Sequence, residues 1–244
     1  MSVTMKRKFV SLLAALMLAA APLHAQLLGF SHSVSLVGVM PTGSFAKSVT
    51  VNSESVPVFD RSQIGKDASL GIGVSYRLGK SFDVLVGDLM PFAEVGFFWN
   101  RIGGDNRDIF DDARSKDPRY RNVPLMVGLQ FRHDLLPMVK PYADLGFGID
   151  WFLPCREGWS DDGSKPYYVF KSSAATAWQF GVGAYIGSMV SVGVTYYGLG
   201  KHAFDFNEKR TEQPGVPGFA RAANNARAEY RRINALALKV AFHF

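Results

Sequence analysis

The sequence predicts an all-β fold, an eight-stranded antiparallel up-and-down transmembrane β-barrel, on three observations. The last ten residues, 235–244, alternate without a break between large apolar residues and small or charged ones, and they end on Phe244. Seven earlier segments alternate with the same period of two, which is the signature of a strand with two different faces. The connections between segments are alternately long and short. Outer-membrane barrels have an even strand count, short turns at one end and long loops at the other.

The first four predicted strands each show this alternation. Segment 30–40 alternates serine with valine, leucine and methionine, and segment 69–78 alternates glycine and serine with larger apolar residues. Segment 91–101, with a lead-in from Val84, places alanine, valine, phenylalanine and tryptophan on the face opposite Glu94. Segment 123–133 alternates valine, leucine and phenylalanine with polar residues and glycine. Glycine weakens an ordinary strand, but inside a narrow barrel it makes room for bulky neighbours.

The last four strands repeat the pattern. Segment 140–152 alternates leucine, phenylalanine, isoleucine and tryptophan with aspartate and glycine. Segments 175–186 and 189–199 are joined by a tight turn at Gly187 and Ser188. Segment 231–244 closes the series. The long connections fall at 41–67, 102–121, 153–173 and 200–229, and the short ones at 79–83, 134–139 and 187–188. This order of long and short connections predicts that both termini lie in the periplasm and that the four long loops lie outside the cell.

The N-terminal segment predicts export. A basic stretch, Lys6 to Lys8, precedes an apolar run over 9–21 and a small residue, Ala25, at the expected cleavage site. This is the pattern of a secretory signal peptide. The apolar run is shorter than the roughly 20 residues that span a bilayer, so a retained anchor is disfavoured. We expect residues 1–25 to be a cleavable signal peptide and 26–244 to form the barrel, in the outer membrane of a Gram-negative cell envelope.

Composition excludes several other classes. The net charge is +6, but three of the basic residues are in the leader, and no basic helix points to nucleic acid. The single cysteine, Cys155, cannot form an internal disulfide and is expected to be a loop thiol. The acidic cluster from Asp105 to Asp112 lacks the spacing of a calcium loop and is interleaved with arginine, so a solvated loop is favoured. We expect no metal and no cofactor.

The face with the smaller residues is expected to line the lumen. It carries basic and acidic residues in balance, which allows pairing inside an enclosed space. Tryptophan and tyrosine collect near the loop ends of the strands and phenylalanine near the opposite ends, as in the aromatic belts of membrane proteins. A soluble periplasmic barrel is the rival interpretation. The predicted structural network in the lumen consists of Arg77, Glu94, Gln130, Arg132, Asp144 and Lys239. Lys239 is expected to reach Glu94 or Asp144.

Several short pieces of the chain resemble a known family. They include residues 37–45 (VGVMPTGSF), 91–96 (PFAEVG), 140–148 (KPYADLGFG) and 194–200 (VTYYGLG), together with the terminal phenylalanine. In order and spacing the chain is similar to the OmpA/OmpX-like outer-membrane barrels, in particular the stand-alone "porin family" barrels of Bacteroidota. The resemblance implies an eight-stranded barrel whose terminal strand, with Phe242 and Phe244, is recognised by the barrel-assembly machinery. Unlike OmpA proper, no peptidoglycan-binding domain follows.

The functional expectation is a non-enzymatic outer-membrane barrel with a structural or interaction role and a mostly plugged lumen. A small-solute or ligand-binding channel is the alternative. The basic loops 102–121 and 200–229 could meet lipopolysaccharide phosphates or a surface ligand. An enzyme would need a histidine at the outer rim, and only His202, beside Asp205, qualifies; a loop histidine is favoured. The sequence gives no indication of oligomeric state.

Overall fold

The computed structural model describes most of the predicted strands and only parts of their connections. The described residues are 29–47, 66–103, 119–134, 138–153, 156–157, 168–169, 172–204 and 229–244. The predicted signal peptide at 1–25 lies outside them, so its prediction stays open. No helix among these residues is long and apolar enough to cross a membrane.

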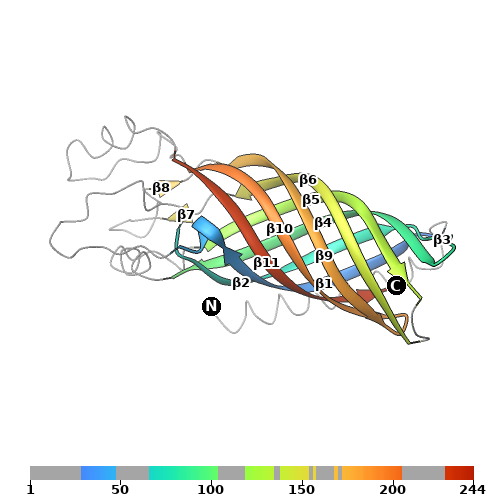
Figure 1. Ribbon diagram of the computed structural model, residues 1–244. Coiled ribbons are helices and arrows are strands. Elements are labelled where there is room, and N and C mark those ends of the chain that lie inside the picture. Colours follow the sequence, from blue (N-terminus) through green and yellow to red (C-terminus); the bar gives the residue numbers. More distant parts are fainter. Residues whose placement is uncertain are drawn as a thin grey trace, which may run out of the picture.

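Eight long strands form a closed antiparallel barrel, which confirms the predicted fold class (Figure 1). Each strand pairs with its neighbours in the chain, and the first pairs with the last. The strands are β1 (Ser31–Thr42), β2 (Ala68–Gly79), β4 (Gly87–Ile102), β5 (Arg119–His133), β6 (Val139–Leu153), β9 (Ser173–Ile186), β10 (Val190–Phe204) and β11 (Glu229–His243). Smaller elements are η2 (Gly43–Phe45), β3 (Phe82–Val84), β7 (Arg156–Glu157) and β8 (Tyr168–Val169).

The barrel closes along the seam between β1 and β11. The register runs from Ser33 opposite His243 to Thr42 opposite Asn234. Past the end of β11, the amide of Phe244 donates to the carbonyl of His32 at 2.9 Å. The predicted pairing of the terminal strand with the first strand is therefore confirmed, and closure leaves neither strand with a free edge.

One short connection differs from its prediction. The segment 79–83 was expected to be a short connection to a strand at 91–101 with a lead-in from Val84, whereas β4 begins at Gly87 and residues 82–84 form a separate strand, β3, that pairs with it. The hairpin turns at Leu85 and Val86 and projects from the end of the barrel where the short turns lie (Figure 1). Gly87 has a φ of +149°, a backbone conformation that side chains disfavour, which explains a glycine at this point.

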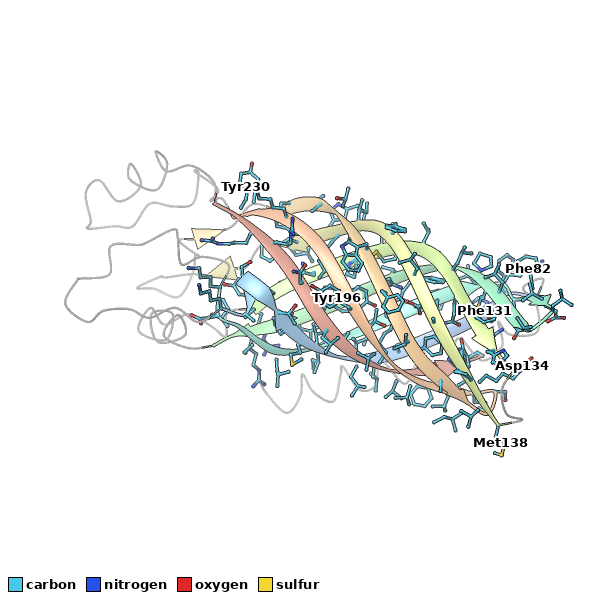
Figure 2. The ribbon with its side chains drawn as sticks, in the orientation of Figure 1. Phe82, Phe131, Asp134, Met138, Tyr196 and Tyr230 are labelled. Atoms are coloured by element: carbon cyan, nitrogen blue, oxygen red, sulfur yellow. The ribbon has the colours of Figure 1, made fainter. Side chains whose placement is uncertain are left out.

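The two faces of the barrel have opposite polarity. Every barrel strand exposes a large apolar side chain on its outer face, whereas the lumen holds nearly all of the charged side chains that lie mid-strand. The outward residues include Leu36, Ile72, Val95, Leu125, Phe147, Phe180, Val194 and Leu238. Figure 2 shows side chains covering the outside along the whole barrel, with Tyr230 at one end and Phe82 and Met138 at the other. A soluble barrel would bury such residues inside.

Glycines on the inner face allow the strands and lumen side chains to approach closely. A Cβ added at Gly148 would lie 1.9 Å from the carbonyl oxygen of Leu125, and one added at Gly193 would lie 2.1 Å from the hydroxyl of Tyr142. Gly38, on the outer face, has no such neighbour within 3.9 Å; its nearest atom is a carbonyl oxygen of Leu238 at 4.0 Å. The inward glycines therefore provide space for the lumen side chains.

Candidate functional site: the polar lumen and its rim

Glu94 is the centre of a buried network of charged and hydroxyl groups. Its Oε2 accepts from Arg77, with Nη2 at 2.6 Å and Nε at 2.7 Å. Its Oε1 accepts from Lys239 Nζ at 2.6 Å and from the hydroxyl of Tyr197 at 2.9 Å. The side chains of Glu94, Arg77 and Lys239 are all nearly inaccessible to solvent. Both carboxylate oxygens are therefore satisfied by charge-assisted hydrogen bonds, the strongest kind.

Asp144 extends this network to a second carboxylate. Arg77 Nη1 lies 2.9 Å from Asp144 Oδ2, so one guanidinium joins two carboxylates. The amide of Gln130 donates to the same oxygen at 3.4 Å, and the hydroxyl of Tyr185 donates to Gln130 Oε1 at 2.8 Å. We call the connected set the lumen network: Arg77, Glu94, Gln130, Asp144, Tyr185, Tyr197 and Lys239. Its two cations balance its two carboxylates, which an enclosed set of charges requires.

Arg132 lies at the turn-side edge of the lumen network, which it contacts through Tyr185. Its Nη2 pairs with Asp88 Oδ2 at 3.1 Å and contacts the hydroxyl of Ser81. Its guanidinium lies over the ring of Tyr185, 5.0 Å from the centroid. Arg132 is inward but near the turn end of β5, where Asp88 at the start of β4 faces it. Asp88 lies in the lead-in of the predicted strand, and the sequence analysis did not identify it as the partner of Arg132.

An apolar plug fills the lumen on the loop side of the network. Phe98 packs edge-on against Tyr197 with ring centroids 5.1 Å apart, and Phe45 from η2 packs against Tyr120 at 5.0 Å. The plug comprises Val37, Val39, Phe45, Ala68, Phe98, Ile102, Tyr120, Met126, Phe152, Ala177, Tyr197, Leu199, Ile233, Ala235 and Ala237. Eight strands enclose a space that side chains can fill, and here they fill it.

A second polar group lies at the loop end of the barrel. Asp150 and His202 are both fully buried, with His202 Nε2 3.1 Å from Asp150 Oδ2. Asn122 Nδ2 donates to the same carboxylate oxygen at 2.5 Å. On the other side of the imidazole, Ser173 Oγ lies 3.0 Å from Nδ1. We call Asn122, Asp150, Ser173 and His202 the rim cluster.

A β-bulge turns His202 into the lumen. The register of β10 with β11 passes from Gly198 opposite Asn234 to Lys201 opposite Arg232, so β10 holds one extra residue. Before the bulge the odd-numbered residues of β10 face inward; after it His202 is buried and Lys201 is exposed. Gly200 has a φ of +91°, and bulges often place glycine in such a conformation.

The sequence placed His202 in a loop, and that prediction is wrong. The predicted strand ended at Leu199, because strict alternation fails at the bulge, whereas β10 continues to Phe204. Asp205, the predicted neighbour of His202, lies outside the described residues, and the acid that contacts His202 is Asp150. The pair of glycines at 198 and 200 was the available signal of a bulge.

Some of the other predicted features lie in the described strands, and the rest lie outside the described residues. Phe242 lies in β11, opposite Val34 of β1 and Val190 of β10, and Phe244 follows the strand. Aromatic side chains near the loop end contact each other on the outer face, as Trp178 does with Tyr196 at 5.4 Å between centroids. Cys155 and the acidic cluster of 105–112 lie outside the described residues. Among the residues that are described, no three histidine, cysteine or acidic side chains are grouped so that they could hold a metal.

Comparison with known proteins gives structural matches only. No family profile and no curated protein sequence matches the chain, so the resemblance to the "porin family" and to Bacteroidota stays a prediction. Among solved structures, Neisserial surface protein A aligns with a TM-score of 0.42 at 10% identity, covering 88% of this chain and 96% of that chain. The outer membrane protein OprG of Pseudomonas aeruginosa aligns with a TM-score of 0.42 at 11% identity, covering 88% and 95%. At this level the matches carry no argument about function.

A third match corrects one expectation. The outer membrane enzyme PagL aligns with a TM-score of 0.41 at 17% identity, covering 86% of this chain and 97% of that chain. The sequence-based conclusion that this chain is not an enzyme is therefore withdrawn, because an outer-membrane barrel that is an enzyme is among the matched structures. A barrel of this kind does not by itself exclude catalysis.

Proposed function

We propose that the chain is an integral outer-membrane barrel with a closed lumen, which serves a structural or interaction role at its loop end. The inverted polarity of the barrel carries this proposal. Apolar side chains such as Leu36, Phe147 and Leu238 are exposed on the outside, while Arg77 and Glu94 are buried within. In a bilayer this arrangement buries apolar surface against lipid and pairs Arg77 and Lys239 with carboxylates inside the lumen.

Closure of the lumen supports a role other than free diffusion of solutes. The lumen network and the apolar plug form consecutive layers that meet at Tyr197. Tyr197, Phe98 of the plug and Gln130 of the network are almost completely buried. Conduction would require displacing a side chain held by several hydrogen bonds or by ring packing. A small-solute or ligand-binding channel, the alternative function, would require such a displacement.

Cell fractionation tests the membrane location, and conductance measurements test whether the lumen is closed. The chain is expected in the outer-membrane fraction, and its appearance in the soluble periplasmic fraction would refute the membrane assignment. In planar bilayers the purified barrel is expected to give no stable conductance. A variant with Phe98→Ala and Tyr197→Ala, which removes two packed rings, is the positive control and should conduct more. Large, stable conductance of the unmodified barrel would favour the channel.

Basic side chains at the loop end support an anionic partner. Lys201 lies opposite Arg232 across β10 and β11. Like charges in directly opposite positions destabilise a sheet unless an anion lies between them. Lys201 and Arg232 are exposed on the outer face, beyond the aromatic residues. Phosphate groups of lipopolysaccharide in the outer leaflet would bridge Lys201 and Arg232.

Binding of lipopolysaccharide can be measured on the purified barrel. Added lipopolysaccharide is expected to raise the thermal midpoint of the unmodified barrel, and less so that of a Lys201→Gln/Arg232→Gln variant. A Lys80→Gln variant is the matched control, since Lys80 lies at the opposite end, over the rings of Phe30 and Phe82. An equal response from all three proteins would contradict the proposed site.

We also propose that the barrel-assembly machinery recognises Phe244 at the end of the terminal strand.

A further inference from the structure

The rim cluster has the connectivity of a serine hydrolase triad. A nucleophilic hydroxyl, an imidazole and a carboxylate lie in a chain, with 3.0 Å between Ser173 Oγ and His202 Nδ1 and 3.1 Å between His202 Nε2 and Asp150 Oδ2. Such triads are recognised by geometry and roles, not by the order of residues in the sequence. Ser173 lies in β9, His202 in β10 and Asp150 in β6. These three strands are neighbours in the barrel, and the three residues lie at its loop end.

The tautomer of His202 follows from its other hydrogen bond. Nε2 lies 2.8 Å from the carbonyl oxygen of Leu199, and a carbonyl can only accept. Nε2 therefore carries a proton and shares it between Leu199 and the carboxylate of Asp150. In the neutral ring this leaves Nδ1 as the acceptor, and it faces the hydroxyl of Ser173. The imidazole is thus oriented as a general base toward the one serine it contacts.

Supporting contacts hold this geometry. Asn122 donates to Asp150 at 2.5 Å and fixes the carboxylate, while the ring of Phe152 packs on the imidazole with centroids 5.9 Å apart. The bulge in β10 includes a positive φ at Gly200, and it turns the side chain of His202 into the lumen. Bulges are over-represented beside active sites for this reason. The arrangement meets the requirement for a base that is oriented by a third group.

Ser173 is the member of the cluster that a substrate can reach. Asp150 and His202 are fully buried, whereas Ser173 is half-buried at the first position of β9, and the preceding Ser172 is exposed. The neighbouring ladder pair, Trp151 and Ala174, lies on the apolar outer face. Ser173 and its ladder partner Phe152 face inward instead, so a substrate reaches the Ser173 hydroxyl from the loop end of the barrel.

We propose that Ser173 and His202 hydrolyse carboxylic esters, with Asp150 as a positioning residue. Ser173 Oγ attacks the ester carbonyl carbon and its proton moves to His202 Nδ1. The tetrahedral adduct collapses, the bond between carbon and alkoxy oxygen breaks, and His202 returns the proton to the leaving alcohol. Water then attacks the acyl-serine with His202 as the base. Collapse of the second adduct releases the carboxylic acid and restores the Ser173 hydroxyl.

Covalent labelling of the folded, unmodified protein is the first test. A fluorophosphonate reacts with an activated serine by losing fluoride, and mass spectrometry locates the phosphonate. The label is expected on Ser173 and is expected to be lost in Ser173→Ala. Ser191→Ala is the matched control, because Ser191 Oγ lies 2.8 Å from His243 Nε2 without belonging to the rim cluster. Absence of label on Ser173 in the folded protein would overturn the proposal.

Ester hydrolysis is the second test, with p-nitrophenyl octanoate as substrate and the barrel in detergent micelles. Ser173→Ala and His202→Gln are expected to lower kcat by at least about 10²-fold, since general base catalysis contributes about 10² to 10⁴. Asp150→Asn is expected to lower kcat with little change in KM, as fits a residue that orients the imidazole. Retention of folding is checked by heat-modifiable migration in gels. If His202→Gln does not fold, labelling of Ser173 in the unmodified protein decides whether this serine is activated. Unchanged hydrolysis by folded Ser173→Ala would refute the activity, and it would leave the closed-lumen proposal untouched.

Discussion

Replacing Glu94 with glutamine removes the charge on which the lumen network is centred. Glu94 is the direct partner of Arg77 and Lys239, with the nearest atoms 2.6 Å away in both cases. At that distance Coulomb's law with an effective dielectric constant of about 20 gives an attraction of about 6 kcal/mol, before the desolvation of both charges is subtracted. Removing one member of a buried pair leaves an uncompensated charge and costs about 3 to 5 kcal/mol. We expect Glu94→Gln to lower the free energy of unfolding by that amount.

Urea titration of the barrel in detergent, followed by tryptophan fluorescence, measures this loss. Asp88→Asn is the matched control, since its pair with Arg132 is 3.1 Å long and both side chains are 16% exposed. The control is expected to cost about 1 kcal/mol or less. Lys239→Met added to Glu94→Gln should recover at least about 1 kcal/mol, because it removes the orphaned ammonium. A loss below about 1 kcal/mol for Glu94→Gln, or equal losses for it and the control, would refute the reasoning.

Three further changes test other parts of the barrel. Gly148→Ala places a Cβ 1.9 Å from a backbone oxygen and should cost about 1 to 3 kcal/mol in the same urea titration, whereas Gly38→Ala, with its nearest atom at 4.0 Å, should stay within about 0.5 kcal/mol. Gly200→Ala forces a side chain onto a φ of +91° and should cost about 1 to 3 kcal/mol; an unchanged unfolding midpoint would contradict the role given to the bulge. Deletion of Phe244 should lower the amount of barrel in the outer membrane, measured by immunoblot, and normal amounts would show that it is dispensable for assembly.

The outline of the barrel could be predicted from the sequence because the alternation of side chains reports directly on strand faces. Strand number and the inward direction of Glu94, Asp144 and Lys239 follow from the period of two along each strand. Lys239 was expected to reach Glu94 or Asp144, and it contacts Glu94. Period-two patterns say little about the height at which residues of different strands meet, because the stagger between strands sets it. The pairing of Arg132 with Asp88, and not with Glu94 or Asp144, is a consequence of that stagger.

The rim cluster could not be predicted because its histidine lies beyond an irregularity. One extra residue in β10 exchanges the faces of every residue after it, so the alternation stops at Leu199 and both Lys201 and His202 were assigned to a loop. The cluster also joins residues far apart in the sequence, and no local spacing relates Asp150 to Ser173 and His202. The glycines at 198 and 200 indicate that regular pairing fails there, but they do not indicate which residue turns inward.

The seam between β1 and β11 has a consequence for how the barrel forms. Every other ladder of the barrel joins strands that are consecutive along the chain among the eight, so each can form as a local hairpin. The seam joins the first strand to the last, and its loop-closure entropy is the largest of the eight. Contacts of such high sequence separation form slowly. The seam is therefore expected to be the last ladder to form, and until it does β1 and β11 are both unpaired edges on which a folding catalyst, or another unfinished barrel, can add a strand.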